Sequence, residues 1–155
     1  MKYKYIFIGT SRSGKSTACR ELLKKTGGIY LDIVDYVYSF IKRENISQLE
    51  SNRDLLKIPY EELCKDLEKG KQWDILELAS DFPEIFLPKV FSITKTPIRV
   101  VYCRCPLDIC LKRNEQEERR VPEEIIYEQH KYDENYYRTL VSKYGAEFDV
   151  LDTAS

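Results

Sequence analysis

The sequence has no excess of charge of either sign and no long apolar run. Its 155 residues include 25 Lys and Arg against 26 Asp and Glu, a formal net charge of -1. This balance excludes a global positive field that would hold a long nucleic acid, so any contact with nucleic acid must be local. Because no apolar stretch approaches bilayer length and no signal peptide precedes the first expected strand, the sequence predicts a cytoplasmic protein without a membrane span.

Cysteine and histidine do not form the spacings of a common metal centre. The five cysteines are odd in number and mostly lie within apolar patterns, which argues against a disulfide framework and a four-ligand zinc site. The one histidine, His130, is expected to be structural or to face solvent. With no repeat and no low-complexity tract, the length fits one domain spanning residues 1–155.

Apolar strand patterns alternate with helical patterns along the chain. Strands are expected at 3–8, 29–33, 73–78, 98–103 and 148–151. Helices are expected at 16–25, 35–41 and 83–91, from Pro59 towards Gly70, from Pro106 and, as one long helix, from Pro122 to Gly145, with an exposed crossing at 42–57. This alternation predicts an α/β fold with a doubly wound, five-stranded parallel sheet that binds ligands beyond the carboxyl ends of its strands.

The segment GTSRSGKS, residues 9–16, is the most specific motif. It matches G-x-x-x-x-G-K-[ST] between an expected strand and an expected helix, which is the context that this phosphate-binding loop requires. Lys15 would contact the β and γ phosphates, and the hydroxyl of Ser16 would bind Mg²⁺. The motif predicts a nucleoside triphosphate site made by Gly9, Arg12, Ser13, Gly14, Lys15, Ser16 and Thr17.

The rest of the chain favours a small kinase over other proteins with this loop. No N-K-x-D element for guanine is present, and no room remains for a helical lid domain of the AAA type. Asp35 and Asp81 follow the second and third expected strands, where acceptor-binding acids would lie. A charged segment at about 113–121 is suited to be a short helical lid that brings an arginine to the transferred phosphoryl group.

Several segments resemble the polynucleotide kinase and zeta-toxin-like branch of the P-loop kinases. They are GTSRSGKST at 9–17, GIYLDIVDYV at 28–37, ASDF at 79–82 and CPLDICLKRNEQEERRVPEEII at 105–126. The resemblance implies ATP and Mg²⁺ as cofactors and transfer of the γ-phosphate to a hydroxyl, with a polynucleotide 5′-hydroxyl as the first expected acceptor. It also implies Asp35 as general base, Asp81 at the acceptor or metal shell, and a lid arginine on the phosphate, in the order Arg119, Arg120, Arg113.

Features around the acceptor site leave its substrate open. Tyr36 and Tyr38 stand where a polynucleotide kinase would offer a basic group, so Tyr38 could stack on a nucleobase or lie in the core. Asp35 could instead be a helix N-cap and Asp81 a turn residue. A small-molecule nucleoside or nucleotide kinase is the alternative enzyme, and an ATP-binding switch or slow ATPase is the alternative outside the kinases. No obligate protein partner is evident.

Overall fold

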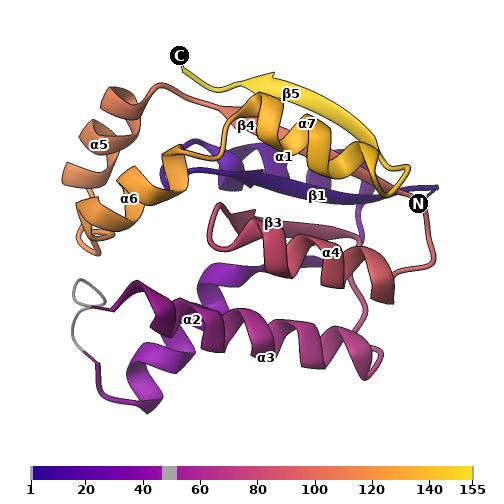
Figure 1. Ribbon diagram of the computed structural model, residues 1–155, viewed down its shortest axis with the longest axis horizontal. Coiled ribbons are helices and arrows are strands. Elements are labelled where there is room, and N and C mark those ends of the chain that lie inside the picture. The colour runs from indigo at the N-terminus through magenta and orange to yellow at the C-terminus, as the bar shows by residue number, and fades with distance from the viewer. Residues whose placement is uncertain (1, 47–51, 155) are drawn as a thin grey trace.

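Five parallel strands form the centre of the molecule (Figure 1). The computed structural model describes residues 2–46 and 52–154. The strands are β1 (Lys4–Gly9), β2 (Tyr30–Asp32), β3 (Ile75–Ala79), β4 (Ile98–Arg104) and β5 (Glu147–Asp152), in the spatial order β2-β3-β1-β4-β5. Every pairing is parallel. The α/β class and the five-stranded parallel sheet expected from the sequence are therefore confirmed.

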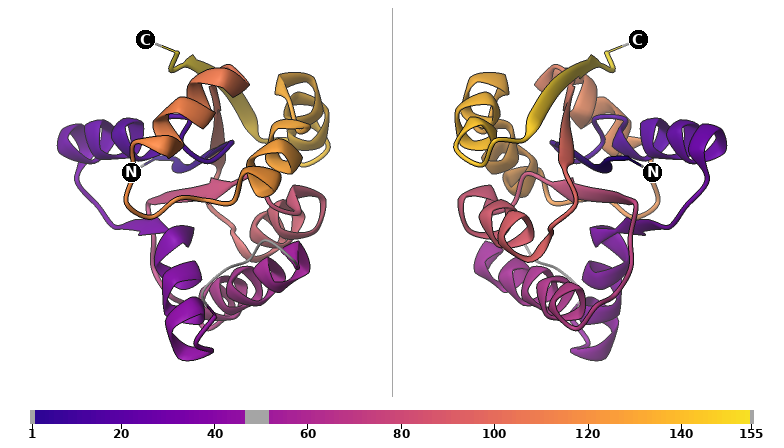
Figure 2. Two further views of the ribbon diagram at one scale, coloured as in Figure 1. Left: turned by 90° about the vertical axis from the view of Figure 1, so that its left-hand side faces the viewer. Right: turned by 90° about the vertical axis from the view of Figure 1, so that its right-hand side faces the viewer.

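Helices cover both faces of the sheet, as Figure 2 shows. They are α1 (Lys15–Thr26), α2 (Ile33–Arg43), α3 (Lys57–Glu68), which follows the 3-10 turn η1 (Arg53–Leu56), α4 (Pro83–Ile93), α5 (Leu107–Glu115), α6 (Glu123–His130) and α7 (Glu134–Ser142). Helix α1 lies on one face, and α4 and α7 lie on the other with α3 beside α4. No helix within the described ranges is long and apolar enough to cross a membrane.

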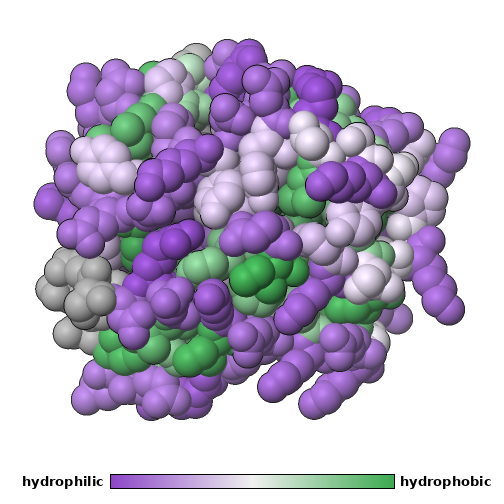
Figure 3. All heavy atoms as spheres, viewed as in Figure 1, coloured by the Kyte–Doolittle hydropathy of each residue, from purple (hydrophilic) through white to green (hydrophobic). Residues whose placement is uncertain are grey.

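Alternation along the strands produces a core on each face. Ile6 and Ile8 of β1 pack on the side of α3, α4 and α7, whereas Phe7 packs with Ile75 and with Cys19 of α1 on the other side. Burial on both faces explains why β1 and β4 read as nearly continuous apolar runs. On the outside, the face seen in Figure 3 is mostly hydrophilic, with its hydrophobic residues in separated patches.

The long helix expected from Pro122 to Gly145 is in fact two helices. Helix α6 ends at His130, and α7 begins after Asp133. The carboxylate of Asp133 accepts a hydrogen bond from the N–H of Tyr136 at 2.9 Å and so caps α7. A short acidic side chain stabilises a helix start better than a helix interior, which is why the apolar stripe of the sequence is interrupted here.

The second helix begins earlier than expected, and this changes which aspartate lies at the sheet edge. Strand β2 ends at Asp32, whose Oδ1 accepts from the N–H of Val34 at 2.9 Å and caps α2. Asp35 consequently lies in the first turn of α2 and is exposed. The crossing expected at 42–57 is partly helical, since η1 and the start of α3 lie within it; residues 47–51 of this crossing lie outside the described residues.

Candidate active site

The loop between β1 and α1 turns tightly at two glycines. Gly14 has a φ of 94°, in the left-handed region that favours glycine. A Cβ on Gly9 would lie 2.8 Å from the carbonyl oxygen of Cys103, so no side chain fits there. The N–H of Ser13 donates to the carbonyl of Thr10 at 3.1 Å and closes the turn. A tight turn ahead of a helix N-terminus presents backbone N–H groups to an anion.

Lys15 and Ser16 place a cation and a hydroxyl at the start of α1. The ammonium group of Lys15 is buried and donates to the carbonyl of Thr10 at 2.7 Å. The Oγ of Ser16 lies 3.0 Å from each carboxylate oxygen of Glu77, a buried residue in the middle of β3. Strand β3 therefore supplies an acid to the first turn of α1.

A second carboxylate lies beside the first on the neighbouring strand. Asp32 of β2 pairs in register with Glu77, and the hydroxyl of Tyr30 contacts both: it donates to Oε1 of Glu77 and lies 3.4 Å from Oδ2 of Asp32. Burial, and next the charge of Glu77, raise the pKa of Asp32 to about 6. Burial and the hydrogen bond to Glu77 raise the pKa of Tyr30, so its hydroxyl remains a donor at neutral pH.

The oxygens of this corner fit a magnesium ion that a nucleotide helps to hold. Ser16 and Glu77 offer a hydroxyl and a carboxylate, which are hard ligands, and the carboxylate of Asp32 lies on the neighbouring strand. Among the described residues, no group of three or more His, Cys, Asp or Glu side chains could hold a metal ion alone. Mg²⁺ is usually bound through one or two carboxylates together with substrate phosphates and water. The donor set matches that pattern.

A cleft of about 940 Å³ opens at the carboxyl ends of the strands. One wall comes from the loop and α1, and another from α2, η1 and α3. The side chains on the second wall are mainly apolar or aromatic: Ile33, Val34, Val37, Tyr38, Ile41, Leu56 and Tyr60. The site thus combines a phosphate-binding loop with an apolar wall, at the sheet edge where ligands of doubly wound folds bind.

Asp81 is a buried carboxyl at the floor of the cleft. Its Oδ2 accepts from the hydroxyl of Tyr60 and its Oδ1 from the Nε2 of Gln129, both at 3.0 Å. Burial raises the pKa of Asp81, while these two hydrogen bonds act in the opposite direction. Asp81 therefore has structural partners as well as a place in the cleft.

Helix α6 is attached directly to the outer part of the loop. The N–H of Ser11 donates to Oε1 of Gln129 at 2.8 Å. The Nδ1 of His130 lies 3.1 Å from Oγ1 of Thr10. His130 thus has a structural contact, one of the two positions expected for it, and the segment after the expected lid is tied to the loop.

Two of the candidate lid arginines differ in what they contact. The guanidinium of Arg119 lies 4.5 Å from the ring centre of Tyr38, so it reaches from the lid segment to α2. The carbonyl of Arg119 also accepts a hydrogen bond from Arg12 of the loop. Arg120 donates to the carbonyl of Glu115 at 2.9 Å, within its own segment. Arg119 is therefore the one that joins both sides of the cleft.

Arg113, the third candidate, braces the loop. Its guanidinium donates to the carbonyl of Arg12 at 3.1 Å and to the carbonyl of Thr153 at 2.7 Å. The hydroxyl of Thr153 in turn donates to the carbonyl of Ser13. The exit of β5 and the end of α5 consequently hold the loop at Arg12 and Ser13.

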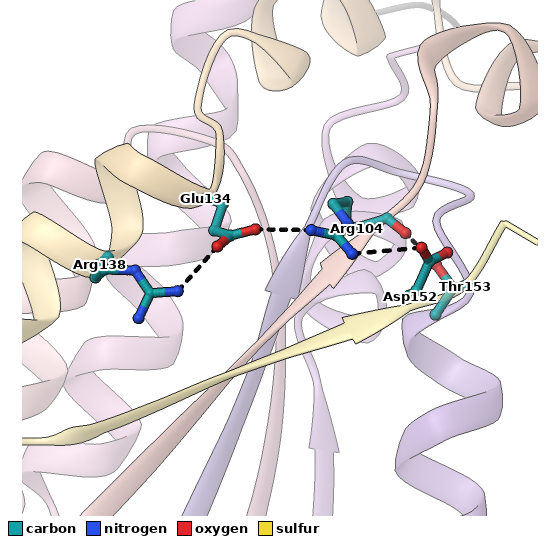
Figure 4. A network of polar contacts seen from close by, with 5 residues as sticks. All are labelled: Arg104, Glu134, Arg138, Asp152 and Thr153. Atoms are coloured by element: carbon teal, nitrogen blue, oxygen red, sulfur yellow. Dashed lines mark hydrogen bonds and ion pairs between the residues drawn. The ribbon is translucent and has the colours of Figure 1, made fainter.

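The network in Figure 4 explains how the exit of β5 is held. Arg104 at the end of β4 donates to Glu134 at 2.9 Å and to Asp152 at 3.4 Å, and Arg138 donates to Glu134 at 2.9 Å. The N–H of Thr153 donates to the carbonyl of Arg104 at 3.0 Å. These exposed ion pairs are individually weak. They lie next to Thr153, whose hydroxyl contacts the loop.

The structure brings most of the predicted site residues together. Those that line the cleft are Arg12, Gly14, Lys15, Ser16, Thr17, Tyr38, Asp81, Arg113, Arg119 and Arg120. Gly9 and Ser13 shape the loop from beneath and do not line the cleft. Asp35 does not line it either, because the strand that should deliver it ends three residues earlier, at Asp32.

Sequence reasoning missed Asp32, Glu77 and Gln129. Glu77 could have been found, since it is the one charged residue in the apolar strand ILELA. Asp32 is the one charged residue of the strand expected at 29–33, and it was overlooked because the next helix was expected to begin only at residue 35. Gln129 carries no signal, because its contacts come from segments far apart in the chain.

Solved structures of several kinases share this fold. Deoxyadenosine kinase from M. mycoides with bound dATP matches with a TM-score of 0.65 and 20% identity over 97% of this chain and 91% of that chain. A gluconokinase from Sinorhizobium meliloti 1021 matches with 0.63 and 12% over 99% and 84%. Shikimate kinase from Acinetobacter baumannii in complex with shikimate matches with 0.61 and 16% over 99% and 84%.

At these identities the similarity concerns the fold. No family model and no curated protein sequence matches the chain. The structural matches support a P-loop kinase fold and do not confirm the narrower polynucleotide kinase branch that short segments of the sequence resemble. The chain has the fold of the P-loop kinases.

Proposed function

We propose that the protein is an ATP-dependent kinase that transfers the γ-phosphate to a hydroxyl of a small, planar acceptor such as a nucleoside. One observation carries this proposal: the phosphate loop and the carboxylate of Asp32 line the same cleft as the aromatic, uncharged wall of α2 and α3. The first acceptor is thus a small molecule, the alternative named in the sequence analysis, and no longer a polynucleotide end.

The donor nucleotide would lie on the loop. Backbone N–H groups at the start of α1 would bind its phosphates, and Lys15 would exchange its contact with Thr10 for the β and γ phosphates. Ser16 and Glu77 are the residues that would hold Mg²⁺, which when bound neutralises charge on the phosphates. Arg113 and Thr153 keep the loop in place during this exchange.

Asp32 is the residue that would accept the proton of the acceptor hydroxyl. Its Oδ1 is held by the N–H of Val34, which orients the carboxylate at the start of α2. With a pKa of about 6 it is a carboxylate at neutral pH and a stronger base than an ordinary aspartate. Asp35, the base expected from the sequence, is exposed on α2 and outside the cleft.

The wall of the cleft favours a planar, uncharged acceptor over a polynucleotide end. None of its residues from α2, η1 and α3 is basic, so this wall offers no partner to the phosphates of a nucleic-acid strand. Tyr38 offers aromatic surface, and Val37 and Ile41 offer apolar surface, to a base. On the opposite side we expect Arg119, whose guanidinium lies against the ring of Tyr38, to contact the transferred phosphoryl group.

The test is transfer of label from γ-³²P-ATP with Mg²⁺ to a panel of acceptors. The panel contains nucleosides, nucleoside monophosphates, oligonucleotides with 5′-hydroxyl ends, and two alcohols that are not planar, shikimate and gluconate. We expect label in one or more nucleosides. Label in the oligonucleotides alone would restore the polynucleotide acceptor, and bound ATP without any labelled acceptor would indicate a switch or slow ATPase.

A further inference from the structure

Tyr30 has an unusual position between two acids. It lies on β2, and its hydroxyl reaches Oε1 of Glu77 on β3 while remaining 3.4 Å from Oδ2 of Asp32. Neither the loop motif nor the aromatic wall of the cleft includes Tyr30, and it does not line the cleft. Its contacts are therefore to the acids that would hold the metal and accept the proton, rather than to a ligand.

The hydrogen bonds around Glu77 show what Tyr30 can do. The carboxylate of Glu77 has two hydroxyl neighbours, Ser16 from α1 and Tyr30 from β2. Ser16 alone cannot orient the carboxylate, because its Oγ is equally distant, at 3.0 Å, from both carboxylate oxygens. The contact from Tyr30 to Oε1 distinguishes the two oxygens. It thereby sets the rotation of the carboxylate relative to the loop.

Tyr30 also separates two like charges. Asp32 and Glu77 are register partners on adjacent strands, so their ionised side chains repel each other in a partly dry environment. A phenol hydroxyl carries one proton and can donate it to one of the two carboxylates at a time. The shorter contact assigns that proton to Glu77, which leaves Oδ2 of Asp32 for the acceptor side.

We propose that Tyr30 is a positioning residue for the metal: its hydroxyl holds the carboxylate of Glu77 at Ser16 and away from Asp32, so that a divalent cation binds once the nucleotide is present. This proposal rests on the proposed function of the loop as an ATP site. Without the hydroxyl, the carboxylate of Glu77 can rotate. Binding of the cation then also has to fix this orientation, so the cation binds more weakly.

Tyr5 offers a matched control for the loss of one phenol oxygen. Tyr5 on β1 and Tyr30 on β2 both pair in register with Ile75 on β3, on its two sides. Both rings pack on the same apolar cluster around Phe7 and Cys19. Within the described residues the hydroxyl of Tyr5 contacts neither carboxylate. Tyr5→Phe therefore makes the same chemical change at the same depth without touching the acids.

The experiment measures Mn²⁺ binding by the loss of its free electron paramagnetic resonance signal, with the β,γ-imido analogue of ATP bound. Affinity for the analogue in EDTA is measured in parallel. We expect Tyr30→Phe to weaken Mn²⁺ binding about tenfold, the scale of one hydrogen bond to a charged group, with analogue affinity in EDTA unchanged. Tyr5→Phe should leave both quantities unchanged.

Four other outcomes overturn the proposal. Mn²⁺ binding by Tyr30→Phe at wild-type affinity would show that the hydroxyl does not position Glu77. A parallel loss of analogue affinity in EDTA would show a general disturbance of the loop. If the wild type binds the analogue but no Mn²⁺, the metal site itself is absent; if it binds no analogue, the proposed function fails first, and the two failures are thereby distinguished.

Discussion

The side-chain amide of Gln129 joins the phosphate loop to the buried carboxyl of Asp81. Its Oε1 accepts from the N–H of Ser11 at 2.8 Å, and its Nε2 donates to Oδ1 of Asp81 at 3.0 Å. Gln129 and Asp81 are almost completely buried, so the amide and the carboxyl would otherwise lack water as a partner. A single side chain of α6 thus connects the donor loop with the floor of the acceptor cleft.

Replacing Gln129 by Leu should destabilise the protein and loosen the loop. The change removes both hydrogen bonds and leaves the buried Oδ1 of Asp81 without this partner, at a cost of about 1–3 kcal/mol in the free energy of unfolding. Urea denaturation checks the stability, and ATP affinity should fall as well. Gln72→Leu, at an exposed position, is the control and should change neither. Equal stability of the two variants would contradict the role assigned to Gln129.

Two neighbouring aspartates give the sharpest test of the catalytic assignment. Asp32→Asn should lower kcat by about 10²-fold or more, the usual contribution of a general base, with ATP affinity little changed. Asp35→Asn should retain most of the wild-type rate because its side chain is exposed and outside the cleft. A large loss of kcat in Asp35→Asn together with a small loss in Asp32→Asn would show that Asp35 is the base, as expected from the sequence.

The same Asp32→Asn variant should be more stable than the wild type at alkaline pH. The pKa of Asp32 is raised by burial and by Glu77, so its ionised form is disfavoured in the folded state. The ionised Asp32 therefore lowers the free energy of unfolding of the wild type. This loss is absent below the unfolded pKa of about 4, grows as the pH rises to about 6 and is fully present above it. Asn retains the N-cap.

Urea denaturation at several pH values checks this effect. At pH 8 we expect a gain of about 1 kcal/mol in the free energy of unfolding, since solvent screens a partly exposed charge. The gain should vanish below about pH 4, where the wild-type carboxyl is protonated in both states. A gain of the same size at every pH would show that charge burial is not its cause.

The lid arginines can be separated by a pair of alanine variants. Arg119 stacks on Tyr38 across the cleft, whereas Arg120 donates to a carbonyl of its own segment. Arg119→Ala should reduce kcat by about 10²-fold, as expected for the loss of one charge on the transferred phosphoryl group. Arg120→Ala should stay within about threefold of the wild type. Steady-state kinetics of the two variants measures this difference. A larger loss of kcat in Arg120→Ala would show that Arg120, and not Arg119, contacts the phosphoryl group.

Local patterns explain why the fold could be predicted well. Strand periodicity, the glycines at 9 and 14, and the Lys15–Ser16 pair are properties of short segments, so they identify the loop and the alternation of strands and helices without tertiary contacts. The break before α7 was missed because an apolar stripe continued through it, and the capping preference of Asp133 prevailed over that stripe.

The amino-acid sequence by itself determined the parallel α/β fold, the phosphate loop and the charged segment beyond Arg113, because each depends on residues close together in the chain. Only the tertiary structure decided that Asp32 rather than Asp35 lines the cleft, since β2 ends at Asp32 and α2 follows at once, which leaves Asp35, three residues later, in an exposed helix turn. It also brought Glu77 to Ser16 and Gln129 to Ser11. Parallel pairing places strand ends together whatever their separation in sequence, and no local pattern records which side chains meet there.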